Sequence, residues 1–187
     1  MSGNTLIFIR HGKTEIDKAR SISKWVLAEQ GKKEAESLIS IKEFQDVALL
    51  FSSEEEKSYA TIKPLADKIG KKTIKVKDLG EIRRPDAHLI SSEQYEERKH
   101  NLLANLNYTE HGWEKAKNAL KRFRKAVEKI NKQNEGKKII ICAHGTVLTL
   151  YFSYLRNELK NIKETLGFGS YAIVKNNKII KDFEVKN

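Results

Sequence analysis

The chain has 187 residues, and its 36 Lys and Arg against 25 Asp and Glu give a formal net charge of +11 at pH 7. No apolar run reaches the ~20 residues that a transmembrane helix needs, and the 39% of hydrophobic residues is enough for a substantial core. The single cysteine, Cys142, excludes an intramolecular disulfide framework and a multi-cysteine zinc site. We therefore expect one domain over residues 1–187 of a soluble, cytoplasmic protein with no membrane partner.

The predicted elements alternate between short apolar runs and amphipathic helices. In chain order they are a strand at Leu6–Ile9, a helix at Ala28–Ile39, a strand at Val47–Phe51, a helix at Glu54–Ile69, a strand at Thr73–Val76, a helix at Trp113–Asn131, a strand at Lys138–Cys142, a helix at Thr146–Arg156, and a hairpin of Ser170–Lys175 and Lys178–Val185. This order predicts an α/β fold. We expect a three-layer α/β/α sandwich with a mostly parallel central sheet and a C-terminal β-hairpin.

Three local signals refine this prediction. Ser53 and Glu56 have the spacing of a capping box at the start of the second helix, and Pro64 inside that helix predicts a kink or a restart. Asn176-Asn177 is typical of a two-residue hairpin turn, because asparagine tolerates positive φ. Residues Ile82–Gly112 follow no clear periodicity, and we interpret them as a partly helical cap or excursion over the site.

The positive charge fits nucleic acid, a membrane surface or a small anionic substrate. Basic and acidic residues are mixed along the chain, however, and aromatic residues make up only 8% of it. Nucleic-acid binding needs a clustered basic face, and single strands need aromatic stacking platforms as well. We therefore interpret the excess of basic residues as a solvated surface and expect no nucleic-acid partner. The oligomeric state is not indicated by the sequence.

Two predicted strands end in the same way. Leu6–Ile9 is followed by Arg10-His11-Gly12, and Lys138–Cys142 is followed by Ala143-His144-Gly145. In a parallel sheet both ends fall at the carboxyl edge, where open α/β folds bind ligands. Glycine after each histidine allows a sharp turn, and the free N–H groups of a following helix favour an anion. The sequence therefore predicts an anion pocket formed by two histidines.

The residue types in this pocket suit phosphoryl transfer. Arg10 can hold two phosphate oxygens in a bidentate contact, and His11 can attack phosphorus to form a phosphohistidine. Fixed cations can stabilise the charge of the transferred group, so the reaction needs no metal ion. A zinc site formed by His11, His144 and a carboxylate is an alternative, but no ligand pair has the spacing that zinc motifs show.

The ordered set of motifs resembles the histidine phosphatase superfamily, also called the phosphoglycerate mutase-like family. The resemblance runs from about residue 5 to residue 155. It rests on Arg10-His11-Gly12 with Thr14, Leu27–Ala35, Phe51-Ser52-Ser53 with Thr61, Leu79-Gly80-Glu81 and Ala143-His144-Gly145.

The resemblance implies a phosphatase without metal or cofactor that hydrolyses phosphomonoesters, either small or carried on a protein. His11 would take the phosphoryl group, and Arg10, His144 and Gly145 would hold the phosphate. Glu81 would protonate the leaving oxygen and then deprotonate the attacking water. Such a carboxyl has to be partly protonated near neutral pH, so we expect it in a crowded site.

One position departs from the family pattern. Lys57 stands where the family has a second arginine, and it supplies charge without a planar fork. Lys57 could hold phosphate more weakly, or Arg83 or Arg84 could replace it as a substrate-binding residue. The glutamates 54–56 are expected to face solvent. A cofactor-dependent phosphoglycerate mutase and a catalytically impaired module that binds phosphate or phosphoprotein remain alternatives.

Overall fold

The structure is a computed structural model that describes residues 3–17, 19–84, 91–109, 111–160 and 162–185. Its strands are β1 (Thr5–Arg10), β2 (Leu49–Ser52), β3 (Thr73–Lys75), β4 (Lys138–Ala143), β5 (Tyr171–Lys175) and β6 (Lys178–Lys181). Its helices are α1 (Glu29–Ser37), α2 (Glu56–Lys68), α3 (Ser92–Ala104), α4 (Ala116–Gln133) and α5 (Gly145–Leu155), and short 3-10 turns include η1 (Ile22–Lys24).

The six strands form one sheet in the order β3-β2-β4-β1-β5-β6. β2 runs parallel to β3 and β4, and β4 runs parallel to β1, whereas β5 is antiparallel to β1 and β6 is antiparallel to β5. The hairpin turn lies at Asn176 and Asn177, whose φ angles are 51° and 59°. The predicted fold class and the C-terminal hairpin are confirmed.

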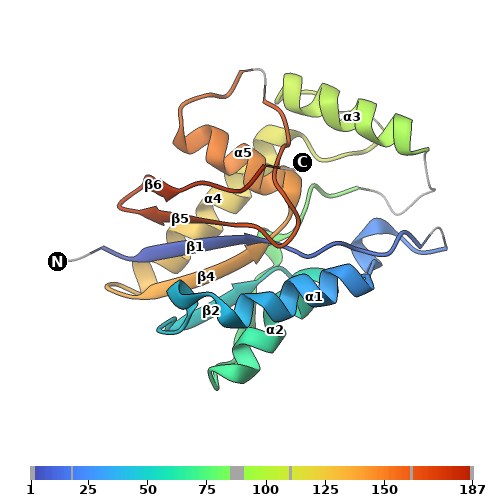
Figure 1. Ribbon diagram of the computed structural model, residues 1–187. Helices are drawn as coiled ribbons and strands as arrows, with labels where there is room; N and C mark the ends of the chain where they lie inside the picture. The colour runs from blue at the N-terminus through green and yellow to red at the C-terminus, as the bar shows by residue number, and fades with distance from the viewer. Residues whose placement is uncertain (1–2, 18, 85–90, 110, 161, 186–187) are drawn as a thin grey trace.

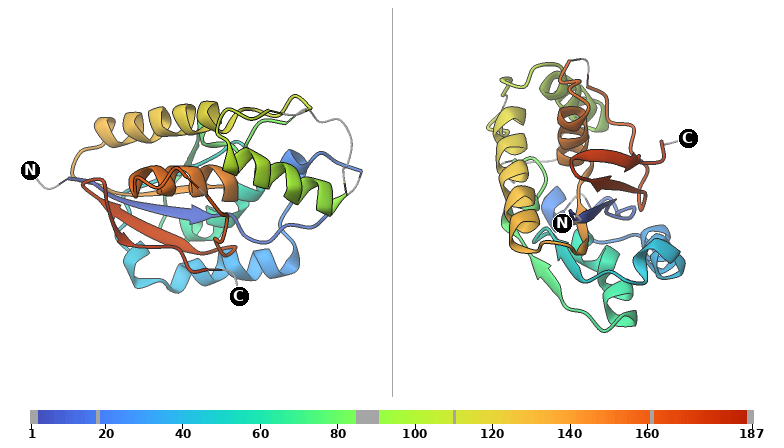
Figure 2. Two further views of the ribbon diagram at one scale, coloured as in Figure 1. Left: turned by 90° about the horizontal axis from the view of Figure 1, so that it is seen from above. Right: turned by 90° about the vertical axis from the view of Figure 1, so that its left-hand side faces the viewer.

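Helices cover both faces of the sheet, with α1 and α2 on one side and α4 and α5 on the other (Figures 1 and 2). Side chains of β1 alternate between two cores. Leu6 and Phe8 belong to the cluster that contains α4 and α5, while Ile7 and Ile9 belong to the cluster that contains α2. Burial on both faces explains why the strands have unbroken apolar runs instead of alternating polarity.

The pairing of β1 with β4 positions the site. Arg10 lies opposite Ala143 at the carboxyl ends of the two strands, so the residues that follow them start at the same level of the sheet edge. α3 lies beyond the carboxyl end of β1 in both Figure 1 and the left view of Figure 2. The sheet edge and α3 thus lie on the same side of the molecule.

The start of α2 differs from the prediction. The helix begins at Glu56, and its N-cap residue Glu55 makes no capping hydrogen bond through its side chain, so the predicted capping box is wrong. The Ser53 hydroxyl contacts the His144 ring instead, at 2.7 Å. Pro64 lies inside α2, which continues without a restart to Lys68.

The segment interpreted as a cap contains α3. A capping box begins this helix, because the Ser91 side chain accepts from the Gln94 backbone N–H and the Gln94 side chain accepts from the Ser91 backbone N–H. Residues 85–90 and 110 of this segment lie outside the described residues. None of the helices among the described residues combines the length and apolar character needed to cross a bilayer. The assignment of the whole chain to one domain remains a prediction.

Candidate active site

The two His-Gly turns bring their imidazoles together. The ring centroids of His11 and His144 lie 5.1 Å apart with an angle of 60° between the planes, and the His11 backbone N–H donates to the Ala143 carbonyl at 3.0 Å. Both side chains line one cavity of about 1440 Å³ at the carboxyl edge of the sheet. The sequence predicted that His11 and His144 lie close together, because each follows the end of a predicted strand. The parallel β1–β4 register is the physical cause of this proximity.

The tautomer of His11 follows from one contact. Its Nδ1 lies 2.8 Å from the Gly12 carbonyl oxygen, which can only accept, so the proton of the neutral ring is on Nδ1. Nε2 therefore carries the lone pair. Gly12 itself is required by crowding, since a Cβ there would lie 2.7 Å from the Gly31 carbonyl oxygen. The Gly12 N–H donates to the Thr61 hydroxyl at 2.9 Å, which fixes the turn.

Both imidazoles are neutral near pH 7. Burial lowers the pKa of His11 well below 6.5, and the charges of Lys57 and Arg10 lower it further. Burial and the charge of Lys57 also lower the pKa of His144 well below 6.5. A neutral ring is a nucleophile, whereas an imidazolium is not, so this environment keeps His11 reactive.

His144 is fully buried, and its two ring nitrogens differ. Nε2 contacts the Ser53 hydroxyl at 2.7 Å and a Glu55 carboxylate oxygen at 3.3 Å. Nδ1 is buried and has no hydrogen-bond partner among the described residues. A buried ring nitrogen of this kind is costly unless a ligand contacts it, which suits a site that binds an oxyanion.

Arg10 is held in place by the segment before β5. Its guanidinium forms an ion pair of 3.0 Å with Glu164, donates to the Leu166 carbonyl and lies 4.1 Å from the Phe168 ring centroid. Its Nε is buried without a partner among the described residues. Gly145 makes room for this pair, because a Cβ there would lie 2.4 Å from a Glu164 carboxylate oxygen.

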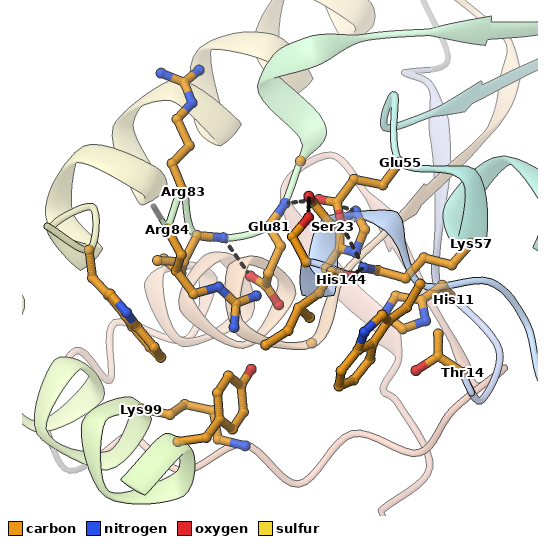
Figure 3. Close-up of a pocket in the computed structure, with 18 of the residues that line it drawn as sticks. His11, Thr14, Ser23, Glu55, Lys57, Glu81, Arg83, Arg84, Lys99 and His144 are labelled. Atoms are coloured by element: carbon orange, nitrogen blue, oxygen red, sulfur yellow. Dashed lines mark hydrogen bonds and ion pairs between the residues drawn. The ribbon is translucent and has the colours of Figure 1, made fainter. Parts of the chain in front are cut away.

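Lys57 lies beside the two histidines. Its side chain is buried, and Nζ donates to the Ile22 carbonyl at 2.6 Å and forms an ion pair of 2.7 Å with Glu55. Arg83 is not brought to the same place: its guanidinium pairs with Asp78 at 3.0 Å on the surface and points away from the pocket in Figure 3. Arg83 contributes to the cavity wall, as Lys57 and Arg84 do, but its charged end is turned to the surface.

Glu81 lies at the N-terminus of α5. Its carboxylate accepts from the backbone N–H groups of Thr146 at 3.0 Å, Val147 at 3.2 Å and Ile82 at 2.9 Å. Burial alone would raise the pKa of Glu81, but the charges of His144 and Arg84 together with these N–H donors lower it overall. Because His144 is neutral near pH 7, its charge does not lower the pKa of Glu81 at that pH. Arg84 and the backbone N–H groups are then what lowers the pKa of Glu81. The direction of this shift is opposite to the one expected for a partly protonated Glu81.

Two further carboxylates were missed by sequence reasoning. Glu55, expected to face solvent, turns inward and contacts Lys57, His144 and the Glu81 backbone N–H, the last at 3.0 Å. Glu164 is buried against Arg10 and lies 3.3 Å from the Thr146 hydroxyl. No motif marks Glu164, because its position depends on the path of the chain between α5 and β5.

Cations predominate in the cavity, where ten Lys and Arg side chains line the wall against five Glu. The described residues contain no group of three His, Cys, Asp or Glu arranged to hold a metal ion. The wall therefore suits an anionic ligand held by protein cations.

Comparisons with known proteins agree with this geometry. No curated protein matches the chain significantly. Among solved structures, Bacillus stearothermophilus YhfR is 20% identical, with 97% of this chain and 96% of that chain covered and a TM-score of 0.81. Mycobacterial glucosyl-3-phosphoglycerate phosphatase is 16% identical, with 97% of each chain covered and a TM-score of 0.79.

A third solved structure is phosphoserine phosphatase from Entamoeba histolytica in complex with 3-phosphoglyceric acid. It is 18% identical, with 97% of this chain and 98% of that chain covered and a TM-score of 0.74. At these identities the likeness concerns the fold. The family model described as histidine phosphatase superfamily (branch 1) matches residues 6–174. Since this match extends from β1 into β5, the chain belongs to the histidine phosphatase superfamily, as its motifs predict.

Proposed function

We propose that the protein is a phosphatase that hydrolyses phosphomonoesters through a phosphohistidine at His11. The observation that carries this proposal is the state of His11, whose Nδ1 contacts a carbonyl oxygen while burial keeps the ring neutral. Nε2 is thereby the nucleophilic atom. The ring centroid of His144 lies 5.1 Å from that of His11. His144 and the cations beside it therefore face His11 across the site for the transferred phosphoryl group.

In the first step Nε2 of His11 attacks phosphorus, the P–N bond forms, and the P–O bond to the leaving alcohol breaks. Arg10 and Lys57 stabilise the charge of the transferred oxygens without a metal ion. The unpartnered Nε of Arg10 and Nδ1 of His144 are the contacts that a phosphate oxygen can satisfy. In the second step water attacks phosphorus, the P–N bond breaks and its electron pair returns to Nε2, which releases inorganic phosphate and restores neutral His11.

Glu81 is the proposed proton carrier. It gives a proton to the leaving alkoxide in the first step and takes one from the attacking water in the second. Arg84 and the backbone N–H donors lower the pKa of Glu81. A phosphate anion bound beside this carboxylate raises its pKa by like-charge repulsion, so substrate binding itself favours the protonated form. Acid conditions should therefore favour turnover of substrates with poor leaving groups.

The direct experiment compares His11→Ala with His100→Ala. Incubation with a radiolabelled phosphomonoester should label the wild-type protein and His100→Ala at residue 11, with the acid-labile, base-stable behaviour of a phosphohistidine. His11→Ala should lose the label and at least ~10³-fold in turnover. His100 is exposed on α3, so its substitution controls for loss of an imidazole. Turnover retained in His11→Ala would show that another group is the nucleophile.

A module that binds phosphate or a phosphoprotein without turnover is the second candidate. Two observations favour it: the Glu55 carboxylate lies on Lys57, and the pKa of Glu81 is lowered. Such a module would bind phosphate or vanadate but would release no product from an activated aryl phosphate. Measured release of product in the wild type, lost in His11→Ala, rejects this candidate.

A further inference from the structure

The segment that carries Glu81 has no regular structure of its own. It follows the 3-10 turn at Lys77–Leu79, and residues 80–84 belong to no helix or strand. Backbone groups in such a segment have to find hydrogen-bond partners elsewhere. The Glu81 N–H donates to the Glu55 carboxylate at 3.0 Å, and the Glu81 carbonyl accepts from Arg122 of α4 at 2.7 Å. Side chains from distant elements therefore hold the backbone at this residue.

Arg122 binds three carbonyls of this segment with one guanidinium. Its Nη1 donates to the Asp78 carbonyl at 2.9 Å and to the Gly80 carbonyl at 2.8 Å, and its Nη2 donates to the Glu81 carbonyl at 2.7 Å. A guanidinium is planar and rigid, so the three carbonyls that it binds are fixed relative to one another and to α4. A lysine at this position would supply the charge without the fork.

Glu114 holds Arg122 in this orientation. Its carboxylate accepts from Nε of Arg122 at 2.9 Å and from Nη2 at 2.8 Å, and it also accepts from the Arg83 backbone N–H at 3.0 Å. The Glu114 backbone N–H donates to the Arg83 carbonyl at 2.8 Å. The side chains of Arg122 and Glu114 are only 10% and 11% exposed, so water competes little for these charge-assisted contacts. The segment is therefore fixed on both sides of Glu81.

The side chain of Glu81 connects this segment to a second helix. Its carboxylate accepts from the backbone N–H groups of Thr146 and Val147 at the start of α5, and Figure 3 shows it inside the pocket. The backbone of Glu81 is thus bound to α4, while its carboxylate is bound to α5. A general acid has to lie about 2.6–3.2 Å from the oxygen that it protonates, and a misplacement of about 1 Å can cost roughly 100-fold in rate. The position of the backbone at Glu81 therefore matters for proton transfer.

We propose that Arg122, held by Glu114, is a positioning residue for the reaction, because it fixes the backbone at Glu81 so that the carboxyl group reaches the leaving oxygen. This inference rests on the proposed function and deepens it, since it names the residues on which the proton transfer depends. Arg122 acts through Glu81 and takes no part in holding the transferred phosphoryl group.

The test measures kcat for an alkyl phosphate and kcat for p-nitrophenyl phosphate on the same preparation of each variant. Arg122→Lys keeps the positive charge, which also acts on His144, but loses the planar fork. We expect it to slow hydrolysis of the alkyl phosphate by about 10 to 100-fold and that of p-nitrophenyl phosphate by less than about threefold, because only the poor leaving group needs a proton from Glu81. The ratio of the two rates does not depend on the folded fraction, so a loss of stability alone leaves the ratio unchanged.

Glu114→Gln is the second variant. One amide oxygen then replaces the two carboxylate oxygens that bind Arg122 and the Arg83 N–H, so the ratio should change in the same direction. Arg124→Lys is the matched control, because Arg124 lies on the same helix outside the cavity wall and pairs with Glu128 at 3.4 Å. It should leave the ratio within about twofold of the wild-type value.

Combination with Glu81→Gln shows whether Arg122 acts through Glu81. If it does, Arg122→Lys should slow hydrolysis of the alkyl phosphate by less than about threefold more in the Glu81→Gln background. A full additional loss in that background, or an unchanged ratio in both Arg122→Lys and Glu114→Gln, would overturn the inference while the phosphatase proposal stands. Absence of turnover of both substrates by the wild type would overturn both.

Discussion

Glu55 places a negative charge on two groups that the proposed mechanism assigns to phosphate. Its carboxylate oxygens lie 2.7 Å from Lys57 Nζ and 3.3 Å from His144 Nε2. The substitution Glu55→Gln removes this charge with little change in shape. The amide oxygen of glutamine can still accept from the Glu81 backbone N–H, which Glu55 now binds at 3.0 Å.

The size of the effect follows from Coulomb's law. A phosphate oxygen in contact with Lys57 would lie roughly 5 Å from the Glu55 carboxylate, and two like unit charges at that distance repel by about 3 kcal/mol at an effective dielectric constant of about 20. Reorientation of the partly exposed carboxylate in the wild type relieves some of this repulsion. We therefore expect Glu55→Gln to bind inorganic phosphate roughly 10 to 100 times more tightly, which is about 1.4 to 2.7 kcal/mol.

Isothermal titration calorimetry with inorganic phosphate at pH 7 measures this change, and product inhibition of turnover gives a second value. Glu56→Gln is the matched control, because Glu56 is exposed and pairs with Lys75 at 3.8 Å on the surface. It should change the Kd by less than about twofold. Equal or weaker phosphate binding in Glu55→Gln would refute the view that this carboxylate competes with substrate.

Two further outcomes are expected. Glu81→Gln should slow hydrolysis of alkyl phosphates by about 10² to 10⁴-fold, but hydrolysis of p-nitrophenyl phosphate by less than about tenfold. The reason is that only poor leaving groups need a proton from Glu81. Equal losses on both substrates would show that Glu81 is not the proton donor. Because folding lowers the pKa of His11 and His144 below 6.5, the unfolded chain binds protons first, and the free energy of unfolding should fall as pH drops below 6.5. Urea denaturation of His11→Asn should therefore show a smaller loss of stability between pH 7 and pH 5 than the wild type does. An unchanged pH dependence would contradict the buried neutral state of His11.

The central part of the site could be predicted because its signals are local. An apolar run that breaks into Arg10-His11-Gly12 contains both the strand and its functional end, and Ala143-His144-Gly145 repeats the pattern. Parallel pairing of β1 with β4 places Arg10 opposite Ala143. The residues that follow, His11 and His144, are therefore brought close together. The strands, four of the five long helices and the two histidines follow from such short-range patterns.

Other features depend on competition between contacts. The capping box of Ser53 and Glu56 does not form, because α2 begins only at Glu56 and Ser53 therefore lies outside its N-cap position. The Ser53 hydroxyl contacts His144 and accepts from the Glu55 backbone N–H. For α3 the apolar periodicity is weak, but Ser91 and Gln94 have the spacing of a real capping box, so a signal was present in the sequence. The sequence around Glu164 carries no such signal.

The balance of charge in the cavity has a consequence for the reaction cycle. Arg10 and Lys57 each have a glutamate partner before any substrate arrives, so a bound phosphate competes with Glu164 and Glu55 for both cations. In the proposed reaction, competition of this kind weakens the binding of inorganic phosphate and so speeds its release after hydrolysis.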